Sequence, residues 1–99
     1  MPTRADRPPL TALKVAAAKV LGRALAPTEL AIYTSLHRAW PRRLTPRKIA
    51  NEHLGGGLTY AGIDSALRRM VERGLLEPDG AGRERVYDFP EAIIAEARA

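Results

Sequence analysis

The chain has 99 residues, 45% of them hydrophobic and 27% charged, a composition that fits one domain with a single core and excludes a disordered chain. It contains no cysteine, which excludes disulfides and thiolate metal sites, and no apolar run near the ~20 residues that span a bilayer. The net charge of +5 favours a polyanionic binding partner.

The positive charge is concentrated in the first three quarters of the chain. Residues 1–44 contain eight Lys or Arg and two acidic residues, and residues 45–73 contain five and three. Residues 74–99 contain three and six, so the C-terminal part is acidic. A solvated basic surface without a ligand would give the same counts, because charge alone identifies neither a fold nor a partner.

The first half of the sequence predicts an arm followed by three helices. Residues 1–9 contain three prolines and no apolar period, so we expect a flexible basic arm before a single domain over 10–99. Apolar residues recur at helical spacing over 10–25, with Val20 among them. A second helix begins at Pro27 and ends before Trp40-Pro41, and residues 42–44 form an extended link.

The second half predicts two further helices, a hairpin and a terminal helix. Thr45 and Pro46 begin a helix that the glycine run 55–57 ends. Thr59 caps the next helix, over 59–73, whose inward stripe is Ile63, Ala66, Leu67 and Met70. Strands over 75–77 and 85–89 flank a turn at 78–82, and a last helix covers 90–98. The fold class expected is mainly α with a small β-hairpin (α+β).

Four segments carry a resemblance to a known family. They are residues 25–30 (LAPTEL), 44–50 (LTPRKIA), 66–76 (ALRRMVERGLL) and 85–87 (RVY). The stretch 25–89 resembles the winged helix-turn-helix domains of MarR-like and ArsR-like transcription regulators of bacteria and archaea. The resemblance implies that 25–89 is the domain core and that the helices 10–25 and 90–98 are additions to it.

The resemblance also implies how the chain would bind double-stranded DNA. The helix 59–73 would be the recognition helix in the major groove, and residues 77–86 would be the wing, on the backbone or in the minor groove. The residues implied in contacts from this helix are Thr59, Tyr60, Gly62, Asp64, Ser65, Arg68 and Arg69. The sequence departs from the family pattern at residues 60–62 (YAG), where small polar residues are usual, and at Asp64. A carboxylate facing DNA is unfavourable unless it accepts from a cytosine amino group or orients Arg68.

Further cations would contact the DNA backbone. Arg47 and Lys48 stand in the first turn of a helix, whose N–H groups and dipole also favour phosphate, and Arg83 and Arg85 flank the tip of the wing. Residues 42–43 are two more arginines, in the link before that helix.

The sequence favours neither an enzyme nor a cofactor or metal protein. His37 and His53 have no neighbouring ligand at metal-binding spacing, and no nucleophile–base or paired-carboxylate arrangement stands out. Because the first residues lack the apolar stretch of a signal peptide, we expect a cytoplasmic protein without membrane contact.

The sequence therefore predicts a DNA-binding transcriptional regulator without cofactors. We expect it to form a homodimer through its two terminal helices, because a small domain does not readily cover both apolar faces within one chain. Two alternatives stay open. One is a winged helix that binds protein, such as a phage or plasmid accessory protein, and the other is a plasmid partition or replication control factor.

Overall fold

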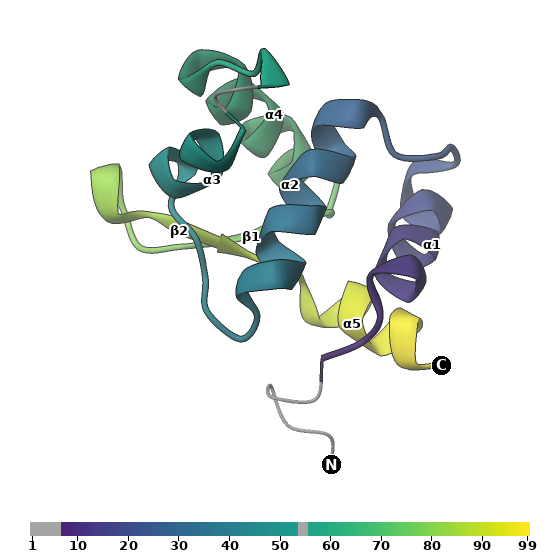
Figure 1. The fold of residues 1–99 in the computed structure, drawn as a ribbon. Helices are drawn as coiled ribbons and strands as arrows, with labels where there is room; N and C mark the ends of the chain where they lie inside the picture. The colour runs from purple at the N-terminus through teal and green to yellow at the C-terminus, as the bar shows by residue number, and fades with distance from the viewer. Residues whose placement is uncertain (1–6, 54–55) are drawn as a thin grey trace.

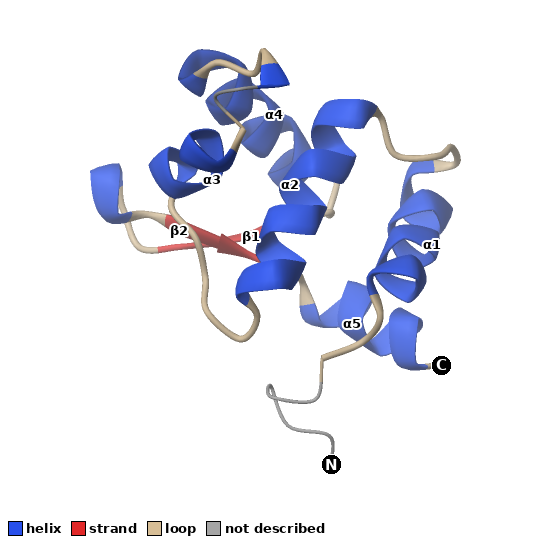
Figure 2. Cartoon of the chain, in the orientation of Figure 1, coloured by secondary structure: helices blue, strands red, loops and turns tan. Residues whose placement is uncertain are grey.

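The computed structural model describes residues 7–53 and 56–99, and within them the chain has five α-helices and one antiparallel hairpin (Figure 1). The mainly helical class with a small hairpin is therefore confirmed (Figure 2). In chain order the elements are α1 (Leu10–Leu21), α2 (Pro27–Ala39), α3 (Pro46–Glu52), α4 (Tyr60–Glu72), β1 (Glu77–Asp79), the short 3₁₀ helix η2 (Gly82–Glu84), β2 (Val86–Asp88) and α5 (Glu91–Arg98).

The starts of α3 and α4 are fixed by the two threonines that the sequence places there. Oγ1 of Thr45 accepts a hydrogen bond from the Lys48 N–H at 3.3 Å, and Oγ1 of Thr59 accepts one from the Gly62 N–H at 3.0 Å. Each bond satisfies a backbone donor that has no partner inside its helix. The predicted boundaries of α4 are confirmed to within one residue at each end.

Helix α1 is shorter than predicted. It ends at Leu21, because Gly22 adopts a left-handed conformation (φ 74°) and its N–H bonds to the Ala18 carbonyl at 2.8 Å. This glycine cap ends the helix four residues before the predicted end at residue 25. Val20, predicted on the apolar face, is 53% exposed, and the buried face is instead formed by Leu13, Ala16 and Ala17.

The structure describes only the last three residues of the predicted N-terminal arm. Residues 1–6 of the predicted arm lie outside the described residues. Arg7 donates to the His37 carbonyl at 3.2 Å, and His37 Nε2 donates to the Pro8 carbonyl at 2.9 Å. Pro8 is buried, so residues 7 and 8 at the end of the predicted arm contact α2.

The hairpin is shifted from the predicted strands. β1 starts at Glu77, and in its register Pro78 pairs with Tyr87. Leu75 and Leu76, predicted as strand residues, precede β1 and lie in the core, where the Tyr33 hydroxyl donates to the Leu75 carbonyl at 2.7 Å. The partner of β2 on its other edge is the link 42–44, since the Tyr87 N–H bonds to the Leu44 carbonyl at 3.0 Å.

One continuous core joins all the helices to the hairpin. The predicted inward stripe of α4 is confirmed, because Ile63, Ala66, Leu67 and Met70 are all buried. Phe89 follows β2 and meets Tyr33 edge-to-face, with 4.8 Å between the ring centroids. Trp40 is also buried, at 5.7 Å from the Phe89 ring, as expected of a core residue near the hairpin. Aromatic side chains therefore fill the core behind α4 and the hairpin.

The two terminal helices cover each other. α5 packs against α1, and Ile93 and Ile94 are only 1% and 2% exposed (Figure 1). Lys19 of α1 pairs with Glu96 of α5 at 2.7 Å on the rim of this contact. The two helices therefore cover much of each other's apolar surface within one chain, although Val15 and Val20 of α1 are exposed. A homodimer through these helices stays a prediction.

Candidate functional site

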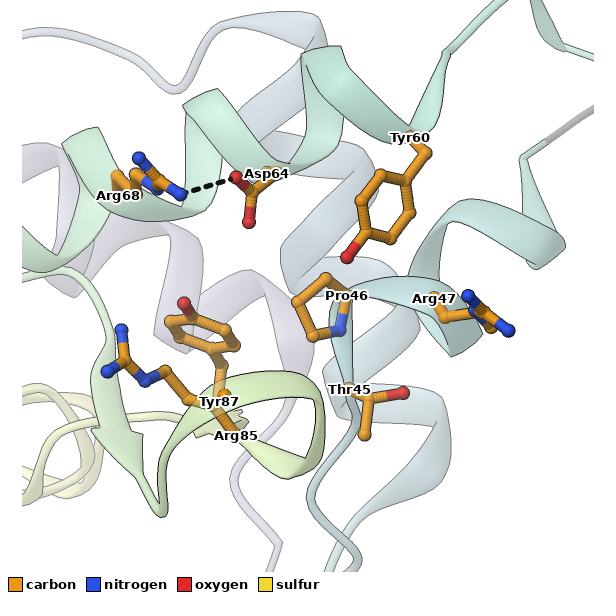
Figure 3. Close-up of a pocket in the computed structure, with 9 residues that line it drawn as sticks. Thr45, Pro46, Arg47, Tyr60, Asp64, Arg68, Arg85 and Tyr87 are labelled. Carbon is orange, nitrogen blue, oxygen red and sulfur yellow. Dashed lines mark ion pairs between the residues drawn. The ribbon is translucent and has the colours of Figure 1, made fainter.

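A groove opens between the start of α3, one side of α4 and the hairpin (Figure 3). Its volume is about 840 Å³. Its walls come from segments that are far apart in sequence. The lining residues are Thr45, Pro46, Arg47, Tyr60, Asp64, Arg68, Gly82, Arg85 and Tyr87.

The α4 wall is a row of three side chains spaced four residues apart. Tyr60, Asp64 and Arg68 lie along one side of the helix, because residues at this spacing are neighbours on its surface. Nη2 of Arg68 lies 3.1 Å from Oδ2 of Asp64 (Figure 3). Arg68 is nevertheless 72% exposed, so its guanidinium is held in place while donors stay open to the groove. The Asp64 carboxylate is thus already occupied by a cation.

Two more guanidinium groups reach the groove from the other walls. Arg47 comes from the first turn of α3, and Arg85 stands between η2 and β2. Both side chains are exposed, and neither makes an ion pair with any described residue. Three guanidinium groups from three separate elements therefore share a groove that contains one carboxylate.

The floor between these charges is apolar and aromatic. Pro46 and Tyr87 are buried, and Tyr60 is 51% exposed with its hydroxyl directed toward the first turn of α3 (Figure 3). Tyr87 is fixed from both sides, by β1 and by Leu44. The buried Pro46 and Tyr87 anchor the two segments from which Arg47 and Arg85 extend.

Arg43 fixes the hairpin that carries Arg85. Its Nη1 donates to Asp79 of β1 at 2.7 Å, and its Nε donates to Asp88 of β2 at 3.0 Å. Asp88 is buried, and its Oδ1 also accepts from the Phe89 N–H at 2.8 Å. This arginine, a sequence candidate for phosphate contact, therefore clamps both strands to the link before α3.

Glu29 fixes the other end of α4. Arg23 donates to its two oxygens at 2.8 and 3.0 Å, and the Ala26 N–H donates to Oε1 at 2.7 Å. Arg73, directly after α4, lies 3.7 Å from Oε2. The hydrogen bonds from Arg23 lower the pKa of the Glu29 carboxyl below its usual range, with help from Ala26 and Arg73 and against the effect of burial. Arg23 and Arg73 thus serve the fold.

The structure brings together five of the eleven side chains predicted to contact DNA. Arg47, Tyr60, Asp64, Arg68 and Arg85 share the groove. The others that are described lie apart from it: Thr59 and Gly62 form the cap of α4, Lys48 lies on the opposite side of α3, Ser65 is exposed on α4 outside the groove, and Arg69 faces Arg23 and Glu29. The side chain of Arg83 is outside what the structure describes.

Sequence reasoning did not find four groove residues: Thr45, Pro46, Gly82 and Tyr87. The sequence predicts Thr45 and Pro46 only as the start of a helix, and Tyr87 only as a strand residue. Their position at the meeting point of α3 and the hairpin depends on the pairing of Leu44 with Tyr87, for which a single sequence carries no local signal.

Both histidines have structural partners. His53 Nε2 lies 2.7 Å from Oγ of the buried Ser35, and His37 holds Pro8 as described. Within residues 7–53 and 56–99, no three His, Cys, Asp or Glu side chains form a group that could hold a metal ion. No described helix combines the length and apolar character required to cross a membrane.

No model of a known protein family matches this chain, and no curated protein is significantly similar to it in sequence. Any functional conclusion therefore depends on the groove and on the resemblance of the segments that build it.

Proposed function

We propose that this chain is a winged helix-turn-helix protein that binds double-stranded DNA as a transcriptional regulator. In this proposal α4 is the recognition helix in the major groove, and the hairpin is the wing beside it. The convergence of Arg47, Arg68 and Arg85 on one open groove is the observation that carries the proposal.

The shape of α4 supports the proposal. Four of its residues are buried in the core, which leaves Ala61, Ser65, Arg68 and Glu72 on the outer face. With side chains a helix is about 10–12 Å wide, and the major groove is about 12 Å wide. The buried stripe of Ile63, Leu67 and Met70 holds the helix to the core, which leaves the outer face free to enter the major groove.

The charges support it as well. A DNA backbone attracts cations that the fold has not already neutralised, and Arg47 and Arg85 make no ion pair among the described residues. Asp64 would oppose DNA if it were alone, but its carboxylate is bound to Arg68. An arginine held in this way is suited to a bidentate contact with O6 and N7 of guanine.

A second candidate function is the binding of a protein partner through the same groove. The observation that favours it is the large exposed aromatic ring of Tyr60, since tyrosine is enriched at protein interfaces. A homodimer also stays a prediction, which sedimentation at micromolar concentrations tests.

The experiment for the proposed function is titration of a labelled duplex of random sequence at low salt. We expect binding that weakens steeply as salt rises, with a slope that reports the number of phosphate contacts. No binding at low salt would contradict the proposal and favour the protein-binding alternative. Selection of bound sequences from a random pool would then give the operator.

A further inference from the structure

A second basic depression lies on the far side of α3 from the groove. Its volume is about 410 Å³, and its cations are Arg38 from the end of α2, Arg42 from the link and Lys48 from α3. Arg43 also lines it but is committed to Asp79 and Asp88. One carboxylate, that of Glu52, is present.

The three cations have no role in holding the fold together. Arg38, Arg42 and Lys48 are all exposed, and none of them makes an ion pair or side-chain hydrogen bond with another described residue. Arg43 stands next to Arg42 in the chain and does the opposite, by clamping the hairpin. Exposed cations that the fold does not neutralise are available to a ligand of opposite charge.

The depression and the groove lie on two sides of the same turn of α3. Arg47 faces the groove, and the next residue, Lys48, lines the depression, so the first turn of α3 separates the two hollows. A duplex seated against α4 would therefore carry its phosphates past Lys48 toward Arg42 and Arg38. B-DNA has one phosphate about every 3.4 Å along each strand, so several phosphates fall within such a path.

We propose that Arg38, Arg42 and Lys48 form a second phosphate-binding surface, which holds the backbone of the same duplex beyond the groove. This inference rests on the proposed function and extends it. The DNA would contact α2 as well as α3, α4 and the hairpin, and the three cations would add affinity that does not depend on base sequence.

The test compares two triple variants that lose the same charge. R38Q/R42Q/K48Q removes the depression cations, and K14Q/K19Q/R98Q removes three cations from α1 and α5, on the opposite part of the molecule (Figure 1). Binding of a random duplex is followed by fluorescence anisotropy over a series of salt concentrations. We expect the depression variant to bind about tenfold or more weakly at ~0.1 M salt, with a salt slope smaller by about 2–3. We expect the control variant to stay within about twofold of the unchanged protein.

The outcomes separate this inference from the proposed function. If the unchanged protein binds no duplex, the proposed function fails. If it binds and both variants match it in affinity and salt slope, the groove stands as the interface and the second surface does not. An equal loss in both variants would also overturn the second surface, since the effect would then come from net charge alone.

A second measurement needs no variant. Acetylation of Lys48 and Lys14 in the unchanged protein is compared with and without bound duplex, by mass spectrometry. We expect DNA to protect Lys48 several-fold and to leave Lys14 unprotected. Equal modification of Lys48 with and without bound duplex would overturn the inference, because a phosphate-bound ammonium is shielded.

Discussion

The charged side chains of two regions, the contact of α1 with α5 and the groove at α3, α4 and the hairpin, differ in whether they are paired. Where α1 meets α5, Lys19 pairs with Glu96 at 2.7 Å across a contact of buried aliphatic side chains. Around α3, α4 and the hairpin, Arg47 and Arg85 line a hollow without an ion-pair partner among the described residues. The first region closes the fold, and the second leaves cations available to a ligand.

The comparison shows that net charge alone does not locate a binding surface. Arginines close in sequence have different roles, since Arg43 clamps the hairpin while Arg42 makes no ion pair with a described residue. Arg23 and Arg73 are likewise bound to Glu29. In the proposed interface, the cations that would attract DNA are those that make no ion pair within the fold.

The largest effect on stability should come from a clamping arginine. Arg43→Ala removes hydrogen bonds to Asp79 and to the buried Asp88, and we expect it to cost about 2 kcal/mol. The melting temperature would then fall by about 10 °C in a domain of this size. Arg42→Ala is the matched control and should change stability by less than about 0.5 kcal/mol. Equal losses in thermal unfolding would contradict the distinction between the two arginines.

The next effect should be on binding and not on stability. Arg68→Ala removes the guanidinium that Asp64 holds in the groove, and we expect a loss of about 1–3 kcal/mol in affinity for a preferred duplex. The melting temperature should stay near that of the unchanged protein, because Arg68 is exposed. Arg69→Ala removes the same charge from the same helix outside the groove and should lose less affinity. An equal or larger loss for Arg69→Ala would move the binding face away from the groove.

A smaller effect concerns acid stability. Because folding lowers the pKa of Glu29, its ionised carboxylate stabilises the fold fully above its unfolded pKa of about 4.3. That contribution disappears as the pH falls through the lower folded pKa. We expect Glu29→Gln to cost about 1 kcal/mol at neutral pH and to flatten the loss of stability below pH ~4. Urea unfolding across this pH range checks the prediction, and parallel curves for both proteins would contradict it.

The smallest effect should come from the ion pair between the terminal helices. Lys19 and Glu96 are 65% and 44% exposed, so their pair is screened by solvent. Lys19→Ala should change the unfolding free energy by less than about 0.5 kcal/mol and leave duplex binding unchanged. A large loss of DNA affinity in this variant would place a binding surface on α1 and α5, and would contradict an interface at the groove.

Local signals in the sequence predicted the helices that build the groove. Thr45 and Thr59 mark the helix starts, and the spacing of Ile63, Leu67 and Met70 marks the buried face of α4. These features depend on residues within a few positions of each other, so a single sequence contains them. The early end of α1 at Gly22 is also marked locally by the glycine, although the apolar period continues beyond it and predicts a longer helix.

Other features depend on contacts between distant residues and were not predictable in this way. Arg43 meets Asp88 only after the hairpin has folded back onto the link before α3. The same folding pairs Leu44 with Tyr87 and so completes the floor of the groove. The sequence also predicted strand residues at Leu75 and Leu76, because β-propensity does not distinguish a strand from buried chain that leads into it.

The most direct test of the account is the duplex affinity of R47Q/R68Q/R85Q beside that of K14Q/K19Q/R98Q. Both variants lose three positive charges, but only the first loses the cations of the groove. We predict salt-sensitive binding by the unchanged protein, near-normal binding by the α1–α5 variant and a loss of about tenfold or more in the groove variant at ~0.1 M salt. Equal affinities for the two variants, or no duplex binding by the unchanged protein at low salt, would contradict the account.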